Sequence, residues 1–390
     1  MQSVINNSEL KKTKKRVMVF IDWYWPGYRA GGPITSCINL VEELISEYDF
    51  YFITRNVDYG DDKVYAKVKS DEWNFIKEGL WIYYASKNNL RMKSFSKIIS
   101  EKEVDYYYIN GIYSFYFSIL PLFLLDKKLK KVIVAPRGML AESAISIKKS
   151  KKRVFLFFAK KFKIYQSVIF HATNEVEHEN VHKSLGDKCE IVLAPNIPSK
   201  LTSSQNTIIK RAGELKLVYI ARIAPEKNLL YALESLLHLE NSKIEFQIYG
   251  PIYNENYWLQ CRKIIADLPQ AIKVIYKGPI SNEKVSEVLS DSHFLFFPTL
   301  GENFGHIIIE SLTSAVPVII SDETPWQDLS ELNAGWAIPL SERSEFVDVL
   351  KECVKMDEVE YSNMRKSAEV YSTIYLKRND YKKYYQKLFP

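Results

Sequence analysis

The sequence predicts an α/β protein of two domains, each built on a parallel sheet. Short apolar runs rich in β-branched and aromatic residues alternate with helical patterns, which is typical of a parallel α/β sheet. At 390 residues the chain is too long for one compact core, so we expect two domains. An apolar content of 47% and an aromatic content of 14% indicate a well-filled globular protein.

The first half of the chain predicts a doubly wound domain over residues 1–200. Seven apolar runs are the predicted strands, and the helical pattern Ile34–Ser46 separates the first two of them. The segment 196–213 is polar and is the predicted interdomain linker. The predicted strands are Val17–Ile21, Phe50–Thr54, Trp81–Ala85, Tyr106–Ile109, Val132–Ala135, Val168–His171 and Glu190–Leu193.

The second half predicts another domain over residues 214–370, followed by a helical segment, 371–390, rich in lysine and tyrosine. The helix Leu229–Leu239 follows the first predicted strand of this half. The predicted strands are Leu217–Ala221, Ile244–Tyr249, Lys273–Tyr276, Phe294–Phe297 and Val316–Ile320.

Two glutamates lie around a helix start in this half, Glu302 in the loop after Phe294–Phe297 and Glu310 eight residues later. Ligands of parallel sheets bind beyond the carboxyl ends of the strands, where this loop is expected. The first amides of the helix are unpaired donors that suit a phosphate, and a glycine lets the backbone approach closely. Carboxylates can instead accept hydrogen bonds from sugar hydroxyls. We therefore expect a sugar attached to a phosphate; the alternative is an ordinary βαβ unit with two surface glutamates. The expected amide donors are Phe304, Gly305 and His306, and Asn303 is an expected donor contact in the same loop.

Two cations follow the strand Leu217–Ala221 at its carboxyl end, Arg222 and Lys227. The guanidinium as a fork and the ammonium as a point charge can neutralise a diphosphate without a metal ion. The alternative is two surface cations around a turn. We expect no metal site and no cofactor besides the nucleotide-linked substrate.

A glycine pair, Gly31-Gly32, lies directly before the helical pattern Ile34–Ser46. Such a loop can bind an anion or a substrate through its amides, although a turn before a helix often needs glycine for conformational reasons alone.

Several motifs resemble those of retaining glycosyltransferases of family 4. Glu302-x7-Glu310, together with Pro317 and Thr324-Pro325-Trp326, is similar to the donor-site signature of this family. The segments APRGML (135–140) and FHATNEVE (170–177) resemble members that build bacterial surface polysaccharides. The resemblance implies the GT-B fold, in which two Rossmann-like domains face each other across the active-site cleft and the terminal helix 371–390 packs back on the first, acceptor-binding domain.

The resemblance also implies roles for individual residues. On the donor side, Glu302 would hold sugar hydroxyls and stabilise positive charge at the anomeric carbon, and Glu310 would hold the ribose hydroxyls. Arg222 and Lys227 match the residues that hold the donor diphosphate, and the loop with Gly31 and Gly32 lies over it.

On the acceptor side, Tyr28 and Arg29 would contact the acceptor. Arg137 and His171 are expected at strand ends facing the cleft, Arg137 for the acceptor and His171 for catalysis; the alternative for His171 is a hydrogen-bonded core histidine. Where many relatives have a histidine before a glycine, this chain has Asn110-Gly111, so no role is carried over there.

The net charge of +6 is too small to indicate a nucleic-acid binder. The segment Lys148–Lys163 combines bulky apolar residues with seven lysines and one arginine. On a helix this pattern is typical of docking on an anionic membrane surface. The alternative is a domain helix with a solvated basic side.

Localisation is expected to be cytoplasmic, peripheral on the inner face of the plasma membrane. The four cysteines are far apart in the sequence and fit a reduced protein. The run Val17–Ile21 is too short for a signal-peptide core. The longest apolar stretch, Ile112–Leu125, falls short of the ~20 residues that a membrane span needs.

The sequence therefore predicts a retaining glycosyltransferase. It would move a sugar from a UDP-, GDP- or dTDP-linked donor to a lipid-linked saccharide in the biosynthesis of O-antigen, capsule or exopolysaccharide. Two alternatives stay open: a GT-B nucleotide-sugar 2-epimerase and a non-catalytic saccharide-binding protein.

Overall fold

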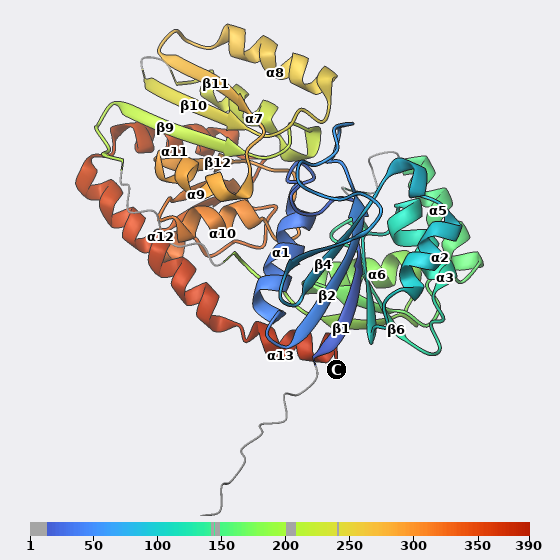
Figure 1. Cartoon of the computed structure of the whole chain (residues 1–390). Coiled ribbons are helices and arrows are strands. Elements are labelled where there is room, and N and C mark those ends of the chain that lie inside the picture. The colour runs from blue at the N-terminus through green and yellow to red at the C-terminus, as the bar shows by residue number, and fades with distance from the viewer. Residues whose placement is uncertain (1–13, 142–143, 145–148, 200–207, 240–241) are drawn as a thin grey trace, which may run out of the picture.

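The computed structural model describes residues 14–141, 144, 149–199, 208–239 and 242–390, and contains two α/β domains, each with its own sheet (Figure 1). Both sheets are parallel apart from one edge pair. Residue 148 of the predicted membrane segment and residues 200–207 of the predicted linker lie outside the described residues.

The first sheet has the strand order β3-β4-β2-β1-β5-β6-β7-β8. Only the edge pair β3 and β4 is antiparallel among the strand pairs of this described sheet. The order changes direction between β1 and β5, which is the switch point where such sheets bind ligands. The strands are β1 (Lys15–Phe20), β2 (Tyr48–Arg55), β3 (Trp73–Lys77), β4 (Leu80–Ala85), β5 (Tyr106–Asn110), β6 (Lys131–Ala135), β7 (Ile169–Ala172) and β8 (Glu190–Leu193).

Helices cover both faces of this sheet, and each face has its own core. Consecutive β1 residues alternate between the two cores, so Met18 and Phe20 pack on one side and Val17 and Val19 on the other. The helices are α1 (Gly32–Leu44), α2 (Met92–Ser100), α3 (Leu120–Leu124), α5 (Lys149–Lys161) and α6 (Glu175–Leu185). The strand β3 was not predicted, because its partly exposed residues lack an apolar alternation.

The second sheet has the order β11-β10-β9-β12-β13-β14, and all its strand pairs in the described chain are parallel. Its switch point lies between β9 and β12. The strands are β9 (Glu214–Ile220), β10 (Lys243–Tyr249), β11 (Ile272–Gly278), β12 (Phe294–Phe297), β13 (Val318–Ser321) and β14 (Gly335–Ile338). The helices are α7 (Leu229–Leu236), α8 (Glu255–Asp267), α9 (Asn282–Ser290), α10 (His306–Thr313), α11 (Arg343–Lys355), α12 (Glu358–Arg378) and α13 (Tyr381–Leu388).

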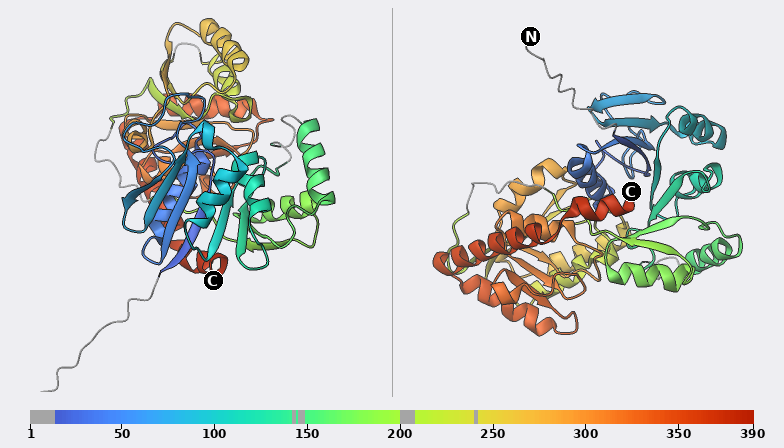
Figure 2. Two further views of the ribbon diagram at one scale, coloured as in Figure 1. Left: turned by 45° about the vertical axis from the view of Figure 1, so that its right-hand side comes forward. Right: turned by 90° about the horizontal axis from the view of Figure 1, so that it is seen from below.

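The chain returns to the first domain at its C-terminal end, as the red helices of Figure 2 show. The return is made by α13, whose Tyr385 and Leu388 pack in the core beside β1, and the Tyr48 hydroxyl donates to the Phe389 carbonyl at 2.8 Å. Tyr371, the first residue of the predicted returning segment, packs instead in the core of the second domain. The domain boundaries at 200 and 214 stay a prediction.

Candidate active site

A cavity of about 1340 Å³ lies between the two domains and is lined by residues of both. All the predicted site residues except His171 line it. These are Tyr28, Arg29, Gly31, Gly32, Arg137, Arg222, Lys227, Glu302, Asn303, Phe304, Gly305, His306 and Glu310. We call its second-domain side, formed by residues after β9 and β12 and by α10, the C-terminal wall. Its first-domain side, formed by residues after β1, β5 and β6, is the N-terminal wall.

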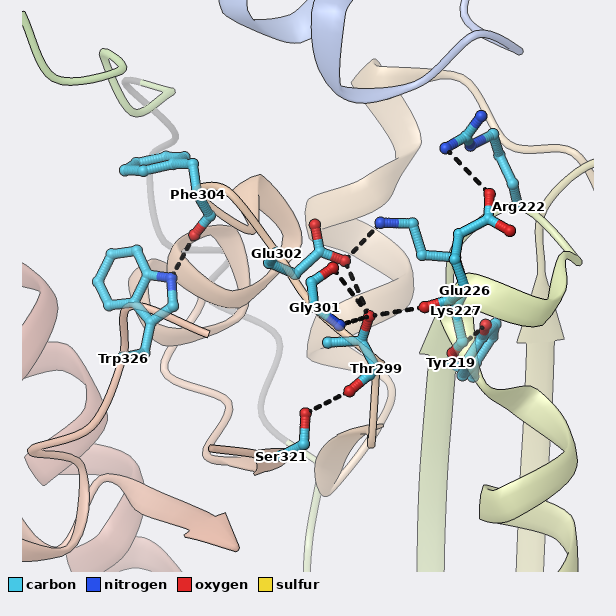
Figure 3. A network of polar contacts seen from close by, with 10 residues as sticks. All are labelled: Tyr219, Arg222, Glu226, Lys227, Thr299, Gly301, Glu302, Phe304, Ser321 and Trp326. Atoms are coloured by element: carbon cyan, nitrogen blue, oxygen red, sulfur yellow. Dashed lines mark hydrogen bonds and ion pairs between the residues drawn. The ribbon is translucent and has the colours of Figure 1, made fainter. Parts of the chain in front are cut away.

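An ion pair lies at the centre of the C-terminal wall (Figure 3). The Lys227 ammonium donates to Glu302 Oε1 at 2.5 Å, and the two side chains are 16% and 13% exposed. The Thr299 hydroxyl lies 3.2 Å from the same oxygen, and the Tyr219 hydroxyl donates to the Lys227 carbonyl at 2.9 Å. Strands β9 and β12 are neighbours, which brings these residues together although they are 75 positions apart.

The loop that carries Glu302 is fixed at several points. The backbone amide of Glu302 donates to the Glu323 carbonyl at 3.0 Å. The Ser321 hydroxyl donates to the Thr299 carbonyl at 2.6 Å, and the Trp326 indole donates to the Phe304 carbonyl at 2.5 Å (Figure 3). A loop bonded in this way holds its carboxylate in one place, as binding of a defined ligand requires.

Arg222 is the second cation of the C-terminal wall. Its guanidinium lies 4.6 Å from the centre of the Tyr253 ring and 3.6 Å from a carboxylate oxygen of Glu226. Tyr253 in turn stacks on Tyr59 of the first domain, with ring centres 4.1 Å apart. The guanidinium is therefore held beside a contact between the two domains, in the lining of the cavity.

The start of α10 presents unpaired amides, as predicted. Within the described residues, the amides of Phe304, Gly305 and His306 donate no hydrogen bond. Gly305 has φ +77°, and a Cβ there would approach Ile308 to 2.8 Å, so only glycine fits. The His306 ring lies 2.8 Å from the Ser36 hydroxyl across the cleft, and burial lowers its pKa to about 3. His306 is therefore neutral at pH 7.

Glu310 lies on α10 one turn beyond His306. Its Oε1 accepts a hydrogen bond from the Ser199 hydroxyl at 3.1 Å. Burial raises the pKa of this carboxyl to about 7, and the Ser199 hydrogen bond opposes the shift. The group can therefore change its protonation state near neutral pH.

Asn303 bridges the two domains, a contact that the sequence analysis did not predict. Its amide nitrogen donates to the Thr173 hydroxyl at 2.7 Å and to Glu177 at 3.3 Å. The side-chain amide of Asn174 donates to the backbone carbonyl of Asn303 at 2.8 Å. The segment FHATNEVE held the signal, since Thr173 and Asn174 directly follow β7 and so lie at its carboxyl end. The donor contact of Asn303 stays a prediction.

The expectation that His171 faces the cleft is wrong. Its side chain is fully buried within β7, where side chains alternate between faces and this one points into the domain. Its Nε2 lies 2.7 Å from the Ala194 carbonyl, and its Nδ1 lies 2.7 Å from the Tyr108 hydroxyl. Burial lowers its pKa to about 3. It is the hydrogen-bonded core histidine that the sequence left open.

Arg137 lines the cavity, but its guanidinium is bonded within the first domain. It donates to the Tyr108 hydroxyl at 2.9 Å, to Asn110 Oδ1 at 3.3 Å and to Asn196 Oδ1. Because the Ala194 carbonyl can only accept a hydrogen bond, the proton of the neutral His171 ring is on Nε2. Nδ1 therefore accepts from the Tyr108 hydroxyl, whose oxygen accepts in turn from Arg137. His171 thus orients Arg137 through Tyr108. The acceptor role of Arg137 stays a prediction.

The loop after β1 carries the other predicted first-domain residues. The carboxylate of Asp58 accepts hydrogen bonds from the amides of Tyr28 and Arg29 at 3.0 and 3.3 Å. The Arg29 guanidinium pairs with Asp61 at 3.2 Å. Gly31 precedes α1 with φ +74°, a conformation that favours glycine. The sequence analysis missed Asp22, which also lines the cavity and directly follows the predicted first strand.

Residues 203–370 match the profile of the family described as Glycosyl transferases group 1. No curated protein sequence matches the chain. Solved glycosyltransferase structures share its fold over almost the full length. Sucrose-phosphate synthase from Thermosynechococcus elongatus superposes with a TM-score of 0.66 at 13% identity, over 97% of this chain and 99% of that one.

Two further structures give the same result. Anabaena HepE in complex with UDP and glucose has a TM-score of 0.67 at 12% identity, over 96% of this chain and 98% of that one. WaaG, a glycosyltransferase involved in lipopolysaccharide biosynthesis, has a TM-score of 0.61 at 13% identity, over 92% and 95%. The chain thus has the predicted GT-B fold, and with the family match the protein is a glycosyltransferase.

Proposed function

We propose that this glycosyltransferase is a retaining enzyme that moves a sugar from a nucleotide sugar to a lipid-linked saccharide in surface polysaccharide biosynthesis. The observation that carries the proposal is the pair of Lys227 and Glu302 in the interdomain cavity, beside α10 amides that have no partner among the described residues. A cation, amide donors and a carboxylate at one place suit a sugar joined to a diphosphate, because phosphate and anomeric carbon are adjacent in such a donor.

The donor diphosphate is assigned to Arg222, Lys227 and the amides at the start of α10. These groups supply fixed positive charge where negative charge develops on the leaving phosphate. Glu302 lies on the sugar side, and Glu310, further along α10, receives the ribose hydroxyls. Anabaena HepE, solved with UDP and glucose, supports a nucleotide sugar as the ligand of this fold.

The transfer proceeds on one face of the donor sugar. The bond from the anomeric carbon to the leaving phosphate breaks while the acceptor oxygen attacks from the same side and passes its proton to that phosphate. Glu302 stabilises the positive charge that develops at the anomeric carbon, which acts mainly in the transition state. The two cations take the place of a divalent metal, so activity should survive EDTA.

The helix α5 is the proposed membrane contact. It turns Leu156 and Ala159 inward, whereas Val154, Phe157 and Phe158 are 55%, 62% and 44% exposed. Exposed basic residues lie beside these apolar side chains, which suits an anionic lipid surface. They are Lys151, Arg153, Lys160, Lys161 and Lys163. No helix in the described part of the chain is both long and apolar enough to cross a membrane.

Co-sedimentation with liposomes tests this contact. Each basic residue near an anionic surface contributes ~1 kcal/mol, so binding should require anionic lipid and fall steeply with salt. Replacing Phe157 and Phe158 by serine should reduce binding without lowering the melting temperature, since both side chains are exposed. Equal binding to neutral vesicles, or none at all, would leave α5 as a helix with a solvated basic side.

A thermal-shift screen with UDP-, GDP- and dTDP-sugars tests the donor assignment, followed by hydrolysis of the stabilising donor without acceptor. Stabilisation and slow release of the sugar are expected. Turnover to an epimerised donor without acceptor would support a 2-epimerase instead. Failure of every nucleotide sugar to bind would leave a non-catalytic saccharide-binding protein.

A further inference from the structure

We propose that the N-terminal wall holds a two-ended acceptor subsite, in which Asp22 receives a hydroxyl of the acceptor saccharide and Lys152 receives the phosphate that joins this saccharide to its lipid. Both side chains line the same cavity as Lys227 and Glu302. The inference rests on the proposed function and names the residues that recognise the second substrate.

Asp22 lies where a sheet of this kind binds ligands. It lies two residues after the end of β1, and Ser114 lies four residues after the end of β5, so the pair spans the switch point of the first sheet. The Ser114 hydroxyl donates to Asp22 Oδ1 at 2.9 Å, and Arg55 Nη2 donates to the same oxygen at 3.1 Å. Among the described residues, none donates to Oδ2. One oxygen is thus used to orient the carboxylate, and the other is available to a ligand.

The arginine that holds Asp22 is itself fixed. Its guanidinium lies 5.5 Å from the centre of the Trp23 ring and 5.2 Å from that of Phe117. The Arg55 amide also donates to the Asp22 carbonyl at 3.1 Å. Backbone and side chain of Asp22 are therefore both held before any ligand arrives. The Asp22 side chain is only 17% exposed, and this burial raises the pKa of the carboxyl.

A preorganised carboxylate in a partly apolar cavity wall suits a sugar hydroxyl. It can accept a short, strong hydrogen bond from the hydroxyl and hold it in a fixed direction. In the proposed transfer the proton goes to the leaving phosphate, so Asp22 positions the acceptor and is not required as the final base.

The other end of the subsite is formed by α5. Lys152 donates to the Ala144 carbonyl at 2.6 Å, and its ammonium lies 5.3 Å from the centre of the Tyr113 ring. An ammonium in such a position can also bind a phosphate oxygen. Two residues further along α5, Val154 begins the exposed apolar side of the helix. A lipid-linked acceptor needs a contact of each kind: an apolar surface for the lipid, a cation for the phosphate and a carboxylate for the sugar, and α5 and Asp22 together supply all three.

Two matched sets of acceptors test the subsite, with the donor that the wild type hydrolyses. One set consists of hexoses and N-acetylhexosamines linked to farnesyl diphosphate, and the other of the corresponding octyl glycosides. Asp22→Asn should reduce transfer to both sets by ~10- to 100-fold, the effect of one charge-assisted hydrogen bond. Lys152→Ala should reduce transfer to the farnesyl diphosphate set by a similar factor and leave the octyl set unchanged. Affinity for the free nucleoside diphosphate, measured by calorimetry, should stay near the wild-type value in both variants, because this ligand is assigned to the C-terminal wall.

Each part can be overturned separately. If Asp22→Asn lowers affinity for the nucleoside diphosphate as much as transfer, or leaves transfer unchanged, Asp22 does not bind the acceptor. Ser114→Ala keeps the charge of Asp22 but removes the hydrogen bond that orients it. If Asp22 does not bind the acceptor, this variant should show no loss of transfer either. A Lys152→Ala variant that loses both sets equally, or neither, contradicts the phosphate contact; detergent solution excludes a membrane headgroup as the cause. A wild type that hydrolyses no nucleotide sugar would instead contradict the proposed function itself.

Discussion

The two walls of the cleft are built on the same topology but use their polar groups differently. In both sheets the ligand-facing residues follow the strands at the switch point. In the C-terminal wall, the charged groups Lys227 and Glu302 are bonded to each other, and nearby amides have no partner in the described chain. In the N-terminal wall, each nitrogen of the Arg137 guanidinium donates to a neutral group of its own domain.

This difference separates groups that can act on a ligand from groups that support the wall. Each member of an ion pair can bind a charged ligand in place of its partner, because it is itself ionised and forms charge-assisted hydrogen bonds. A guanidinium bound by Tyr108, Asn110 and Asn196 has its direction fixed by the protein. We therefore expect substitutions in the C-terminal wall to change chemistry and donor affinity, and substitutions behind Arg137 to change stability.

The largest effect is expected for Lys227→Ala. Removing a fixed cation from the leaving phosphate should lower turnover by ~100- to 1000-fold, as for other preorganised charge-stabilising groups. The melting temperature should change little. Lys243→Ala is a matched control, because Lys243 forms an exposed ion pair with Glu214 on the same sheet. If EDTA abolishes wild-type activity and manganese restores it, the diphosphate assignment of Lys227 and Arg222 is wrong.

Glu302→Gln should lower kcat by on the order of a hundredfold with a smaller effect on KM, because the lost charge acts in the transition state. Nucleoside diphosphate affinity should stay near the wild-type value, which calorimetry can measure. Loss of diphosphate affinity would mean that the roles of Glu302 and Glu310 are exchanged. Wild-type turnover would reduce Glu302 to a loop residue.

Glu310→Ala should weaken binding of the free nucleoside diphosphate by ~1.5–3 kcal/mol, the contribution of one charge-assisted hydrogen bond to the ribose. Intact donor should be affected equally, since both ligands contain the ribose. Calorimetric titration of the folded variant measures both affinities. An unchanged affinity for the diphosphate would remove this role from Glu310.

The raised pKa of Glu310, about 7, adds a test by pH. If the ionised carboxylate accepts the ribose hydrogen bonds, wild-type affinity should fall as pH drops below about 7, and Glu310→Gln should lose this dependence. Stability should show the opposite sign. Because the folded pKa lies above the unfolded value, the folded state binds more protons between these two values, so its stability falls as pH rises through that range. Urea unfolding of wild type against Glu310→Gln, between pH 5 and 8, would show the difference.

The smallest functional effect is expected for Tyr108→Phe, behind the N-terminal wall. Loss of the hydroxyl leaves His171 Nδ1 and one Arg137 donor without a partner, which should lower the free energy of unfolding by ~1–3 kcal/mol. Donor affinity should not change. Tyr106→Phe is the control, since the Tyr106 hydroxyl accepts only a 3.4 Å hydrogen bond from Lys15. A large loss of donor affinity in Tyr108→Phe would contradict the division between the two walls.

The sequence predicted the C-terminal wall well because its determinants are local. Strand ends, a glycine before a helix and the Glu302-x7-Glu310 spacing all lie within short segments, and the structure brings them into one cavity. The antiparallel edge strand β3 and the interior position of His171 could not be predicted, since one lacks an apolar alternation and the other depends on which face of β7 the side chain takes.

Contacts between distant segments were also beyond the sequence. The bridge from Asn303 to Thr173 joins residues 130 positions apart, and the hydrogen bond from Ser114 to Asp22 joins residues 92 apart. Asparagine, threonine, serine and aspartate are all common in ordinary loops, so the residue types alone do not reveal these contacts. Only the packing of two domains and two neighbouring strands shows that they belong to the cleft.

The central claim is that this cleft transfers a sugar from a nucleotide donor with retention. Proton NMR of donor hydrolysis tests it most directly, because α and β anomers of the released sugar give separate signals before they equilibrate. With the α-linked nucleotide sugar that the wild type accepts, the account predicts that the α anomer appears first and that Glu302→Gln releases it far more slowly. First appearance of the β anomer, or an epimerised donor with no released sugar, would contradict the account.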